Sequence, residues 1–442
     1  MVVKEFISEL RTAFPDVEME QAQTNCDLGN NGYVHVYPKS EDEIVTILQY
    51  ANEHGKKIVV QGNGSKKGFG GEKETADILL SLSKYKGIVE HGAGDMTVTV
   101  KSGTSFQELQ EFLSEYKQQV SLDPSWPKYA SIGGVIASND SGPKRLGYGS
   151  ARDAVIGLRI IYPDGTIIRS GGKVVKNVAG YDMNKMYIGS MGTLGVFTEV
   201  TLKLRPLPKK ESVVLISFPE GSFEDIHAFA VKILDSMMEP VSLEFLNPSL
   251  AQKLIGKKQF TLAISFEDVE SSVDYQVKMI QDMKPDQTTL SILLDNEELQ
   301  SFWNQLYSIS PNGVEGNLET KETEACLKVG VKNLSVLNVI RDGQMLQDSH
   351  NLVVTAHGGL GHGICQLNLK GAREDVASVI TNLCQIVGRL KGYVIIKHAP
   401  LSLRQEINVW GDKPTYLFLM EGIKSKIDPN HVLNEKRFLG GI

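Results

Sequence analysis

The sequence predicts an α+β protein of two domains. Its 442 residues are more than one hydrophobic core usually organises, so two domains are expected. The first half combines helix and strand patterns with three glycine-dense loops, at residues 61–71, 131–149 and 189–196. The second half alternates strand and helix patterns, which is typical of a sheet covered by helices.

The elements of the first half follow from local patterns. Residues 40–43 (SEDE) fit a capping box, and apolar residues at helical spacing continue to Ala51. A second helix opens with the same kind of box at residues 105–108. The turn at 163–165 (PDG) separates two apolar runs and predicts a β-hairpin. Other strands are predicted at residues 58–60, 78–80, 97–101 and 196–204.

The segment 206–210 (PLPKK) marks the predicted boundary of the second half. Beyond it the sequence predicts a capped helix over 222–237 and another helix over 271–283. Strands are predicted at 213–218, 262–266 and 393–396. The last segment, from residue 415, predicts a helix followed by an extended stretch.

Composition excludes several classes of protein. The net charge of −7 and the absence of a basic stripe argue against nucleic-acid binding. There is no apolar run of about 18 residues and no signal peptide, so we expect a cytoplasmic protein without a transmembrane segment. The four cysteines form no C-x-x-C pair, which predicts reduced buried thiols and no iron–sulfur cluster; they are Cys26, Cys326, Cys365 and Cys384.

The first glycine loop fits neither common phosphate motif. Gly62 and Gly64 match the start of G-x-G-x-x-G, but Lys67 stands where the third glycine belongs, and no P-loop spacing is present. One interpretation is a loop whose backbone N–H groups form a nest for a diphosphate-bridged cofactor. The other is a flexible surface loop.

The order of segments resembles the FAD-binding domain shared by vanillyl-alcohol oxidase and p-cresol methylhydroxylase. The resemblance rests on residues 38–71, on 131–142 and on the G-T-L-G core of 189–196. Residues 171–195 (GGKVVKNVAGYDMNKMYIGSMGTLG) and the tail from Val409 further resemble the FAD-binding subunits of bacterial glycolate oxidases. The tail departs from the usual N-P-G-R, because Glu435 and Lys436 replace proline and glycine.

The resemblance implies three segments: an FAD-binding domain over 1–208, an α/β cap over 209–409, and a C-terminal segment over 410–442 that returns to the first domain. FAD would be bound non-covalently, because no histidine lies between Gly55 and Glu90 for covalent attachment. The residues implied to hold FAD are Gly62, Asn63, Gly64, Ser65, Lys66, Pro124, Ser131, Gly133, Gly134, Asn139, Ser141, Asn177, Gly192, Thr193 and Val196.

Catalytic residues are harder to assign. Related catalytic flavoproteins carry H-x-G-D-G-N-x-H, which supplies a base and metal ligands. Here His357 and His362 are five residues apart and Leu360 replaces the aspartate, so a structural role competes with a catalytic one and we predict no metal. His398 and Tyr181 are further weak candidates for catalysis.

Other polar residues also have two interpretations. Lys176, Asn177, Tyr181 and Asp182 either contact the flavin edge or substrate, or form a turn held by their own side chains. The two arginines at 145 and 152 either meet a phosphate or substrate carboxylate, or form surface salt bridges.

The function implied by the resemblance is oxidation of glycolate or D-lactate to the 2-oxoacid. Electrons would leave through an iron–sulfur partner, beside a catalytic FAD paralogue, and such partners would provide any attachment to a membrane. Two alternatives stay open: an FAD-binding electron-transfer or assembly subunit without oxidation of its own, and a stand-alone flavin oxidase for another alcohol or sugar acid.

Overall fold

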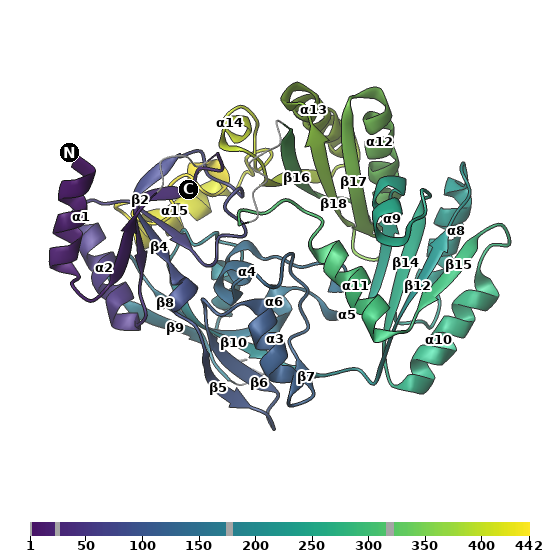
Figure 1. The fold of residues 1–442 in the computed structure, drawn as a ribbon, viewed down its shortest axis with the longest axis horizontal. Coiled ribbons are helices and arrows are strands. Elements are labelled where there is room, and N and C mark those ends of the chain that lie inside the picture. Colours follow the sequence, from purple (N-terminus) through teal and green to yellow (C-terminus); the bar gives the residue numbers. More distant parts are fainter. Residues whose placement is uncertain (1, 23–26, 174–179, 315–321) are drawn as a thin grey trace.

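The computed structural model describes residues 2–22, 27–173, 180–314 and 322–442. Within these residues, a four-stranded and a five-stranded sheet are built from the first half of the chain, and an eight-stranded sheet is built from the second half. The two smaller sheets lie together on the left of Figure 1, and the eight-stranded sheet lies on the right. The mixed α and β architecture predicted from the sequence is confirmed.

The four-stranded sheet has the order β1-β2-β4-β3 and is parallel except for β1. Its helix α2 (Glu41–Glu53) begins at the predicted capping box: Ser40 Oγ accepts from the Glu43 N–H, and the Glu43 carboxylate accepts from the Ser40 N–H. The apolar face of α2 packs into the same core as the strands. The elements are α1 (Val2–Ala13), β1 (Glu18–Gln21), β2 (Asn31–Tyr37), β3 (Ile58–Gln61) and β4 (Thr75–Ser81).

The five-stranded sheet has the order β5-β6-β10-β8-β9, and all its strand pairs are antiparallel. The predicted hairpin is confirmed as the pair β8–β9. Helices α3 (Phe106–Ser114) and α4 (Ile132–Ser138) share one core with this sheet. The strands are β5 (Ile88–Gly92), β6 (Thr97–Lys101), β8 (Val155–Ile161), β9 (Ile167–Gly171) and β10 (Val196–Lys203).

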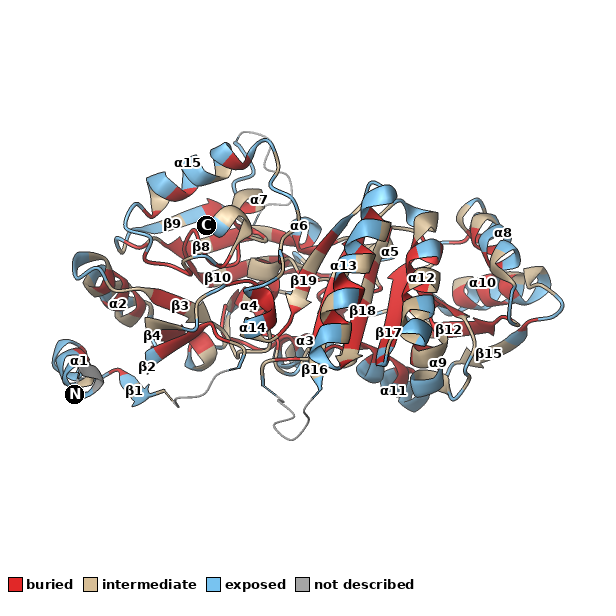
Figure 2. Cartoon of the chain, turned by 90° about the horizontal axis from the view of Figure 1, so that it is seen from above, coloured by how far each residue is buried: buried red, intermediate tan, exposed pale blue. Residues whose placement is uncertain are grey.

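The eight-stranded sheet has the order β15-β12-β14-β13-β17-β18-β16-β19 and is antiparallel throughout. Its inner strands are largely buried, with helices packed on both faces of the sheet, whereas the edge strands β15 and β19 are more exposed (Figure 2). The strands are β12 (Lys210–Ser217), β13 (Ser242–Leu246), β14 (Thr261–Asp268), β15 (Thr289–Leu293), β16 (Thr323–Gly330), β17 (Leu352–Gly359), β18 (Ile364–Gly371) and β19 (Tyr393–His398).

Two separate cores flank this sheet. One face packs against α8 (Phe223–Leu234), α10 (Glu270–Met283), α12 (Val336–Ser349) and α13 (Arg373–Arg389). The other face packs against α9 (Pro248–Ile255) and α11 (Asn296–Tyr307). Small elements complete the described chain: η1 (Leu82–Lys84), β7 (Gln118–Gln119), α5 (Arg145–Tyr148), α6 (Ala151–Ala154), α7 (Asn184–Tyr187), β11 (Arg205–Pro206), η2 (Asn333–Ser335), α14 (Leu401–Arg404) and η3 (Leu439–Gly441).

One predicted helix differs in its ends. The helix expected over 222–237 ends at Leu234, and Ser222 does not cap it with its side chain. The Ser222 hydroxyl instead donates to the Pro219 carbonyl (2.9 Å), so the residue closes the preceding turn. Serine hydroxyls serve either purpose, and the local sequence does not decide between them.

The C-terminal segment returns to the first half of the chain. Helix α15 (Leu417–Ile427) ends at Asp428, whose carboxylate accepts from Lys424 Nζ (2.6 Å) in a buried ion pair. The same carboxylate accepts from the backbone N–H groups of Val432 and Leu433. Leu433 then forms a parallel bridge with Ile58 of β3. The predicted helix with an extended stretch after it is therefore present beside β3.

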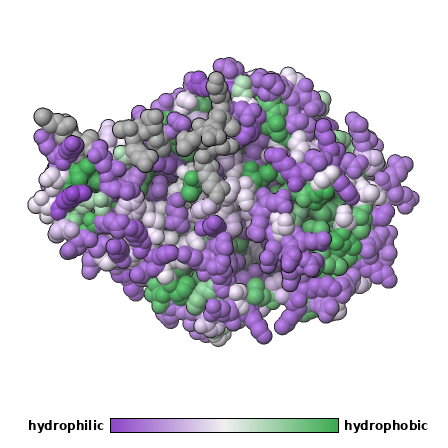
Figure 3. Space-filling view, in the orientation of Figure 1, coloured by the Kyte–Doolittle hydropathy of each residue, from purple (hydrophilic) through white to green (hydrophobic). Residues whose placement is uncertain are grey.

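The visible face of the molecule is mainly hydrophilic, and its apolar side chains form separate patches (Figure 3). None of the described helices has the length and apolar character needed to cross a bilayer.

Candidate active site

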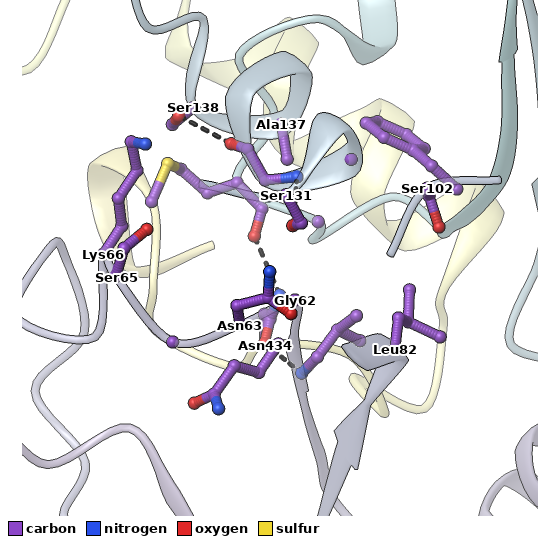
Figure 4. A pocket seen from close by; sticks show the side chains of 18 of the residues that line it. Gly62, Asn63, Ser65, Lys66, Leu82, Ser102, Ser131, Ala137, Ser138 and Asn434 are labelled. Carbon is purple, nitrogen blue, oxygen red and sulfur yellow. Dashed lines mark hydrogen bonds between the residues drawn. The ribbon is translucent and has the colours of Figure 1, made fainter. Parts of the chain in front are cut away.

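A cavity opens between the first glycine loop, helix α4 and the third glycine loop, and we call it the glycine-lined cavity. In Figure 4, Gly62 and Asn63 lie across from Ser131. The space between its walls, open mouth included, is about 710 Å³. The cavity brings together most residues predicted to hold the cofactor: Gly62, Asn63, Gly64, Ser65, Lys66, Ser131, Gly133, Gly134 and Gly192.

The other predicted cofactor residues lie outside this lining. Pro124 lines an open groove beside α3 and α11, and Ser141 lines a second cavity described below. Asn139 ends α4 in the left-handed conformation (φ 47°). Thr193 and Val196 are buried beneath the third loop. Contacts from these five residues to a cofactor stay predictions.

Glycine is required where the loops approach each other. A Cβ on Gly62 would lie 1.9 Å from Ser131 Oγ, the atom that caps α4 by accepting from the Gly134 N–H (3.2 Å). Gly192 has φ +70°, and a Cβ there would lie 2.7 Å from Asn434 Nδ2. At these two glycines the cavity wall is bare backbone, which lets N–H groups come close to a phosphate-bearing ligand.

Two tail residues line this cavity although the sequence analysis did not assign them to the site. Asn434 joins two loops, since its Oδ1 accepts from the Val60 N–H (2.9 Å) and its Nδ2 donates to the Met191 carbonyl (2.8 Å). Arg437 is 9% exposed and donates only to backbone carbonyls among the bonds recorded, at 3.3–3.4 Å. Burial lowers the pKa of Arg437 to about 10. The L-N-E-K-R pattern of the tail was the signal that could have found them.

A chain of buried charges joins this cavity to a second one. Asp140 accepts from Lys397 Nζ at 2.8 Å and forms an ion pair with Lys66 Nζ at 3.2 Å. Burial acts to raise the pKa of Asp140, but the charges of Lys397 and Lys66 outweigh it and hold that pKa well below its usual range. Lys66 also lines the glycine-lined cavity, so the two cavities adjoin.

The second cavity lies between residues 123–145 and the eight-stranded sheet. Two predicted candidates, His357 of β17 and His362 of the following turn, both line it. Glu244 of β13 brings them together: His357 Nδ1 lies 2.7 Å from Glu244 Oε2, and His362 Nε2 lies 3.6 Å from Glu244 Oε1. The two histidines of the glycine-rich motif therefore do meet in space.

The hydrogen bonds indicate how each imidazole is protonated. The Ile364 N–H donates to His362 Nδ1 (3.2 Å), so the hydrogen of a neutral His362 is on Nε2, facing Glu244. His357 donates to Glu244 through Nδ1, which leaves Nε2 with a lone pair. Burial acts to raise the pKa of Glu244, but His357 and His362 outweigh it and lower that pKa to about 2.

The remaining candidates are not part of this cluster. His398 lines a third, smaller cavity, and burial followed by the charge of Arg404 lowers the pKa of His398 to about 4. Tyr181 is 93% exposed, and Asp182 pairs with Lys185 at 3.3 Å. Arg152 is exposed and donates to the Lys185 carbonyl. Lys176 and Asn177 lie outside the described residues.

Sequence reasoning missed four charged residues of the second cavity: Asp123, Asp140, Glu244 and Lys328. Burial raises the pKa of Asp123 to about 7, although the backbone N–H groups of Lys144 and Gly142 oppose this. Glu244 and Lys328 each stand between two buried apolar residues of a strand. A single charge inside a buried strand was the signal that could have found both.

In the parts of the chain that the structure describes, no three His, Cys, Asp or Glu side chains are arranged to hold a metal ion. Cys326 and Cys365 are buried, but Cys384 is exposed on α13, contrary to the expectation of buried thiols. Cys26 lies outside the described residues.

Comparison with known families identifies the part of the chain that contains the first glycine loop. Residues 34–171 match the family model described as "FAD binding domain", and this segment includes the first two glycine loops and the whole of α4. The chain is a flavoprotein with an FAD-binding domain. The expectation of FAD as the cofactor is thereby confirmed, whereas non-covalent attachment stays a prediction.

Curated relatives of this flavoprotein are oxidoreductases. It is 27% identical to the glycolate oxidase subunit GlcD of Bacillus subtilis, over 90% of this chain and 87% of the relative. It is 26% identical to a D-lactate dehydrogenase of Archaeoglobus fulgidus, over 91% of this chain and 90% of the relative. The flavoprotein is an FAD-dependent oxidoreductase, and the predicted resemblance is confirmed.

Solved structures share the fold. p-Cresol methylhydroxylase with substrate bound superposes with a TM-score of 0.76 at 15% identity, over 98% of this chain and 96% of that chain. 4-Ethylphenol oxidase from Gulosibacter chungangensis gives 0.72 at 16% identity, over 94% and 90%. The FAD-binding flavoprotein therefore has the fold of the p-cresol methylhydroxylase type.

Proposed function

We propose that this flavoprotein oxidises glycolate, or the related D-lactate, to the corresponding 2-oxoacid. The observation that carries the proposal is the second cavity, which adjoins the glycine-lined cavity through Lys66 and Asp140 and contains the His357–Glu244 pair. The names of the relatives from Bacillus subtilis and Archaeoglobus fulgidus support this class of substrate.

The glycine-lined cavity suits a non-covalently held FAD. Its loops lack the Cβ atoms that would clash at Gly62 and Gly192, so their backbone stays open to a diphosphate. Arg437 would provide a positive charge for that diphosphate without an ion pair to break among the described residues. When bound, FAD supplies an acceptor for the hydride of the substrate.

His357 is the residue we assign to the hydroxyl proton. Glu244 accepts from His357 Nδ1, which holds the imidazole in the tautomer with a free lone pair on Nε2. The ionised Glu244 also stabilises the imidazolium that forms when Nε2 takes the proton, as the carboxylate does in serine hydrolases. His362 flanks the same carboxylate and limits the movement of its second oxygen.

The electrons would then leave to an iron–sulfur partner subunit. The cysteines described by the structure are dispersed: Cys326 is in β16, Cys365 in β18 and Cys384 in α13. A subunit role is supported by the name of the Bacillus subtilis relative, which is itself one subunit. A catalytic FAD paralogue would complete the complex, and these partners would provide any attachment to a membrane.

One observation favours a second function, an FAD-binding electron-transfer or assembly subunit without oxidation of its own. The motif residue Leu360 is 0% exposed and apolar where catalytic relatives carry an aspartate, so both histidines turn to Glu244 instead. The third possibility, a stand-alone flavin oxidase for another alcohol or sugar acid, differs both in its substrate and in its electron acceptor.

An anaerobic titration of the purified protein with glycolate distinguishes these functions. We expect the oxidised-flavin absorbance to bleach with glycolate or D-lactate. The His357→Gln variant should keep its flavin, but its bleaching rate should fall about 100-fold or more. A yellow protein that stays yellow with both acids would move substrate oxidation to the partner. Oxygen consumption by the isolated chain would assign it to the stand-alone oxidases.

A further inference from the structure

We propose that Lys328 and Arg145 form an anion subsite in the second cavity, and that this subsite binds the carboxylate group of the substrate. The identity of the substrate rests on the proposed function. The presence of an anion subsite rests on the charges of the second cavity alone.

Lys328 is a cation without a counter-ion. It lies on β16, with its neighbours in the strand buried, and it lines the second cavity. In the described part of the chain, no carboxylate lies within ion-pair distance of its ammonium group. Burial, and after it the charge of Lys397, lowers the pKa of Lys328 to about 8. A partly desolvated ammonium of this kind is stabilised by a bound anion.

Arg145 provides a second uncompensated charge at the same cavity. Its Nη1 donates to Ser141 Oγ (2.8 Å), and Arg145 and Lys328 line the same cavity. The positive charge of Arg145 also contributes to lowering the pKa of Lys328. The preceding residue differs: Lys144 forms ion pairs with Glu211 (3.0 Å) and Glu267 (2.5 Å). Among the described residues, Arg145 has no such carboxylate partner.

The other charges of the cavity already have partners. Asp140 is neutralised by Lys66 and Lys397, and Glu244 lies against two histidines. Asp123 faces the same cavity with a pKa raised to about 7 by burial, so much of it is protonated near neutral pH. The lining therefore carries an excess of positive charge, and that excess is located at Lys328 and Arg145.

A guanidinium beside an ammonium is a suitable pair for a carboxylate, because the guanidinium binds both oxygens and the ammonium adds a point charge. His357 lines the same cavity. A molecule that spans these groups carries a carboxylate near a hydroxyl, as a small 2-hydroxyacid does. The subsite would thus orient the hydroxyl toward His357.

Oxalate is a suitable probe, because it is an anion of similar size with no hydroxyl to oxidise. We would measure its dissociation constant by calorimetry on the flavin-loaded wild type and on Lys328→Met and Arg145→Gln. Loss of one charged hydrogen bond should weaken oxalate binding about 10- to 100-fold in either variant. Lys328→Arg should recover much of the affinity, and uncharged glycolamide should bind all proteins equally weakly.

Lys332→Met is the matched control, because Lys332 follows the same strand but is exposed and lies outside the cavity lining. It should bind oxalate like the wild type. Oxalate affinity unchanged in both cavity variants, or absent in the wild type, would overturn the subsite. Oxalate binding that depends on Lys328, in a protein that glycolate does not bleach, would retain the subsite and refute the proposed function instead.

Discussion

His398 ends β19 and is 7% exposed, packed against the first glycine loop. A Cβ on Gly68 would lie 2.7 Å from His398 Nδ1, so the imidazole fills the space that the glycine leaves. Burial, and then the charge of Arg404, lowers the pKa of His398 to about 4. The native imidazole therefore stays neutral over most of the pH range, below about 6.5, in which an unfolded histidine takes up its proton.

This burial predicts a pH-dependent stability. An unfolded histidine has a pKa near 6.5, so the unfolded state binds the extra proton between about pH 6.5 and pH 4. The native state is thus stabilised above that window and loses about 2 kcal/mol between pH 7 and pH 5. In His398→Gln, urea unfolding should show a correspondingly smaller loss over the same interval.

The experiment compares how much the free energy of unfolding changes between the two pH values, because the substitution also alters packing at both pH values. His54→Gln is the control, since His54 is exposed at the end of α2. An equal loss of stability in the wild type and in His398→Gln would contradict the prediction.

For single residues, the sequence predicted the glycine loops of the cavity better than its buried charged residues. The glycine-dense loops that contain Gly62 and Ser131 were visible locally, the family resemblance assigned both residues to the cofactor, and the structure places both in one cavity. Glu244 and Lys328 were missed because each is one charge between apolar neighbours in a strand. Their importance comes from neighbours more than 30 residues away, such as His357 and Lys397.

Among elements, the C-terminal segment has the greatest effect on the site. Asn434 accepts from the Val60 N–H at the end of β3 and donates to the Met191 carbonyl of the third loop. Asn434 is 2% exposed; its bond to the Met191 carbonyl is buried and its bond to the Val60 N–H is partly buried. One side chain of the tail thus holds two walls of the glycine-lined cavity together.

We expect Asn434→Ala to lower the free energy of unfolding by about 1–3 kcal/mol, because it leaves buried backbone groups without partners. It should also weaken FAD binding, which fluorescence of the released flavin would measure. Asn430→Ala is the control: Asn430 is exposed and bonds only Asn52 through its side chain, so stability should change by less than about 0.5 kcal/mol. Equal stability of the two variants would refute this role for Asn434.

The tail also shows a limit of element-level prediction. Its helix was predictable from the local pattern, and its similarity to glycolate oxidase subunits was visible in the sequence. Its pairing with β3, by contrast, joins residues more than 370 positions apart. No periodicity encodes such a contact, because hydrophobic patterns report a buried face but not its partner.

For the whole molecule, Lys144 connects the FAD-binding half to the eight-stranded sheet. Its ammonium pairs with Glu211 of β12 and Glu267 of β14, and it lies 4.7 Å from the centre of the Trp303 ring. Trp303 Nε1 in turn donates to Glu211 (2.6 Å). Burial acts to lower the pKa of Lys144, but the two glutamates outweigh it and raise that pKa.

Lys144→Met should destabilise the protein by about 3–5 kcal/mol in urea unfolding, because it leaves Glu267 buried without a counter-charge. The double variant Lys144→Met with Glu267→Gln should recover part of the loss. Lys39→Met removes the exposed pair with Glu18 and should cost no more than about 1 kcal/mol. Two lysine variants of equal stability would contradict the role of Lys144 at this interface.

The division into two halves was visible in the change of pattern near residue 208, but the way the halves meet was not. The second cavity combines residues from 123–145 with five strands of the large sheet, β13, β16, β17, β18 and β19. Which strand edges face the first half depends on the order β15-β12-β14-β13-β17-β18-β16-β19, and the sequence order of the strands does not reveal that order.

The contact between Ile58 and Leu433 has a consequence for how the protein is made. During synthesis the first glycine loop leaves the ribosome long before Asn434 and Arg437 exist. The cavity that suits FAD therefore has only part of its wall throughout translation of the cap. Stable capture of the cofactor is a late event in biogenesis, so a nascent chain arrested before these residues would be colourless even where FAD is abundant.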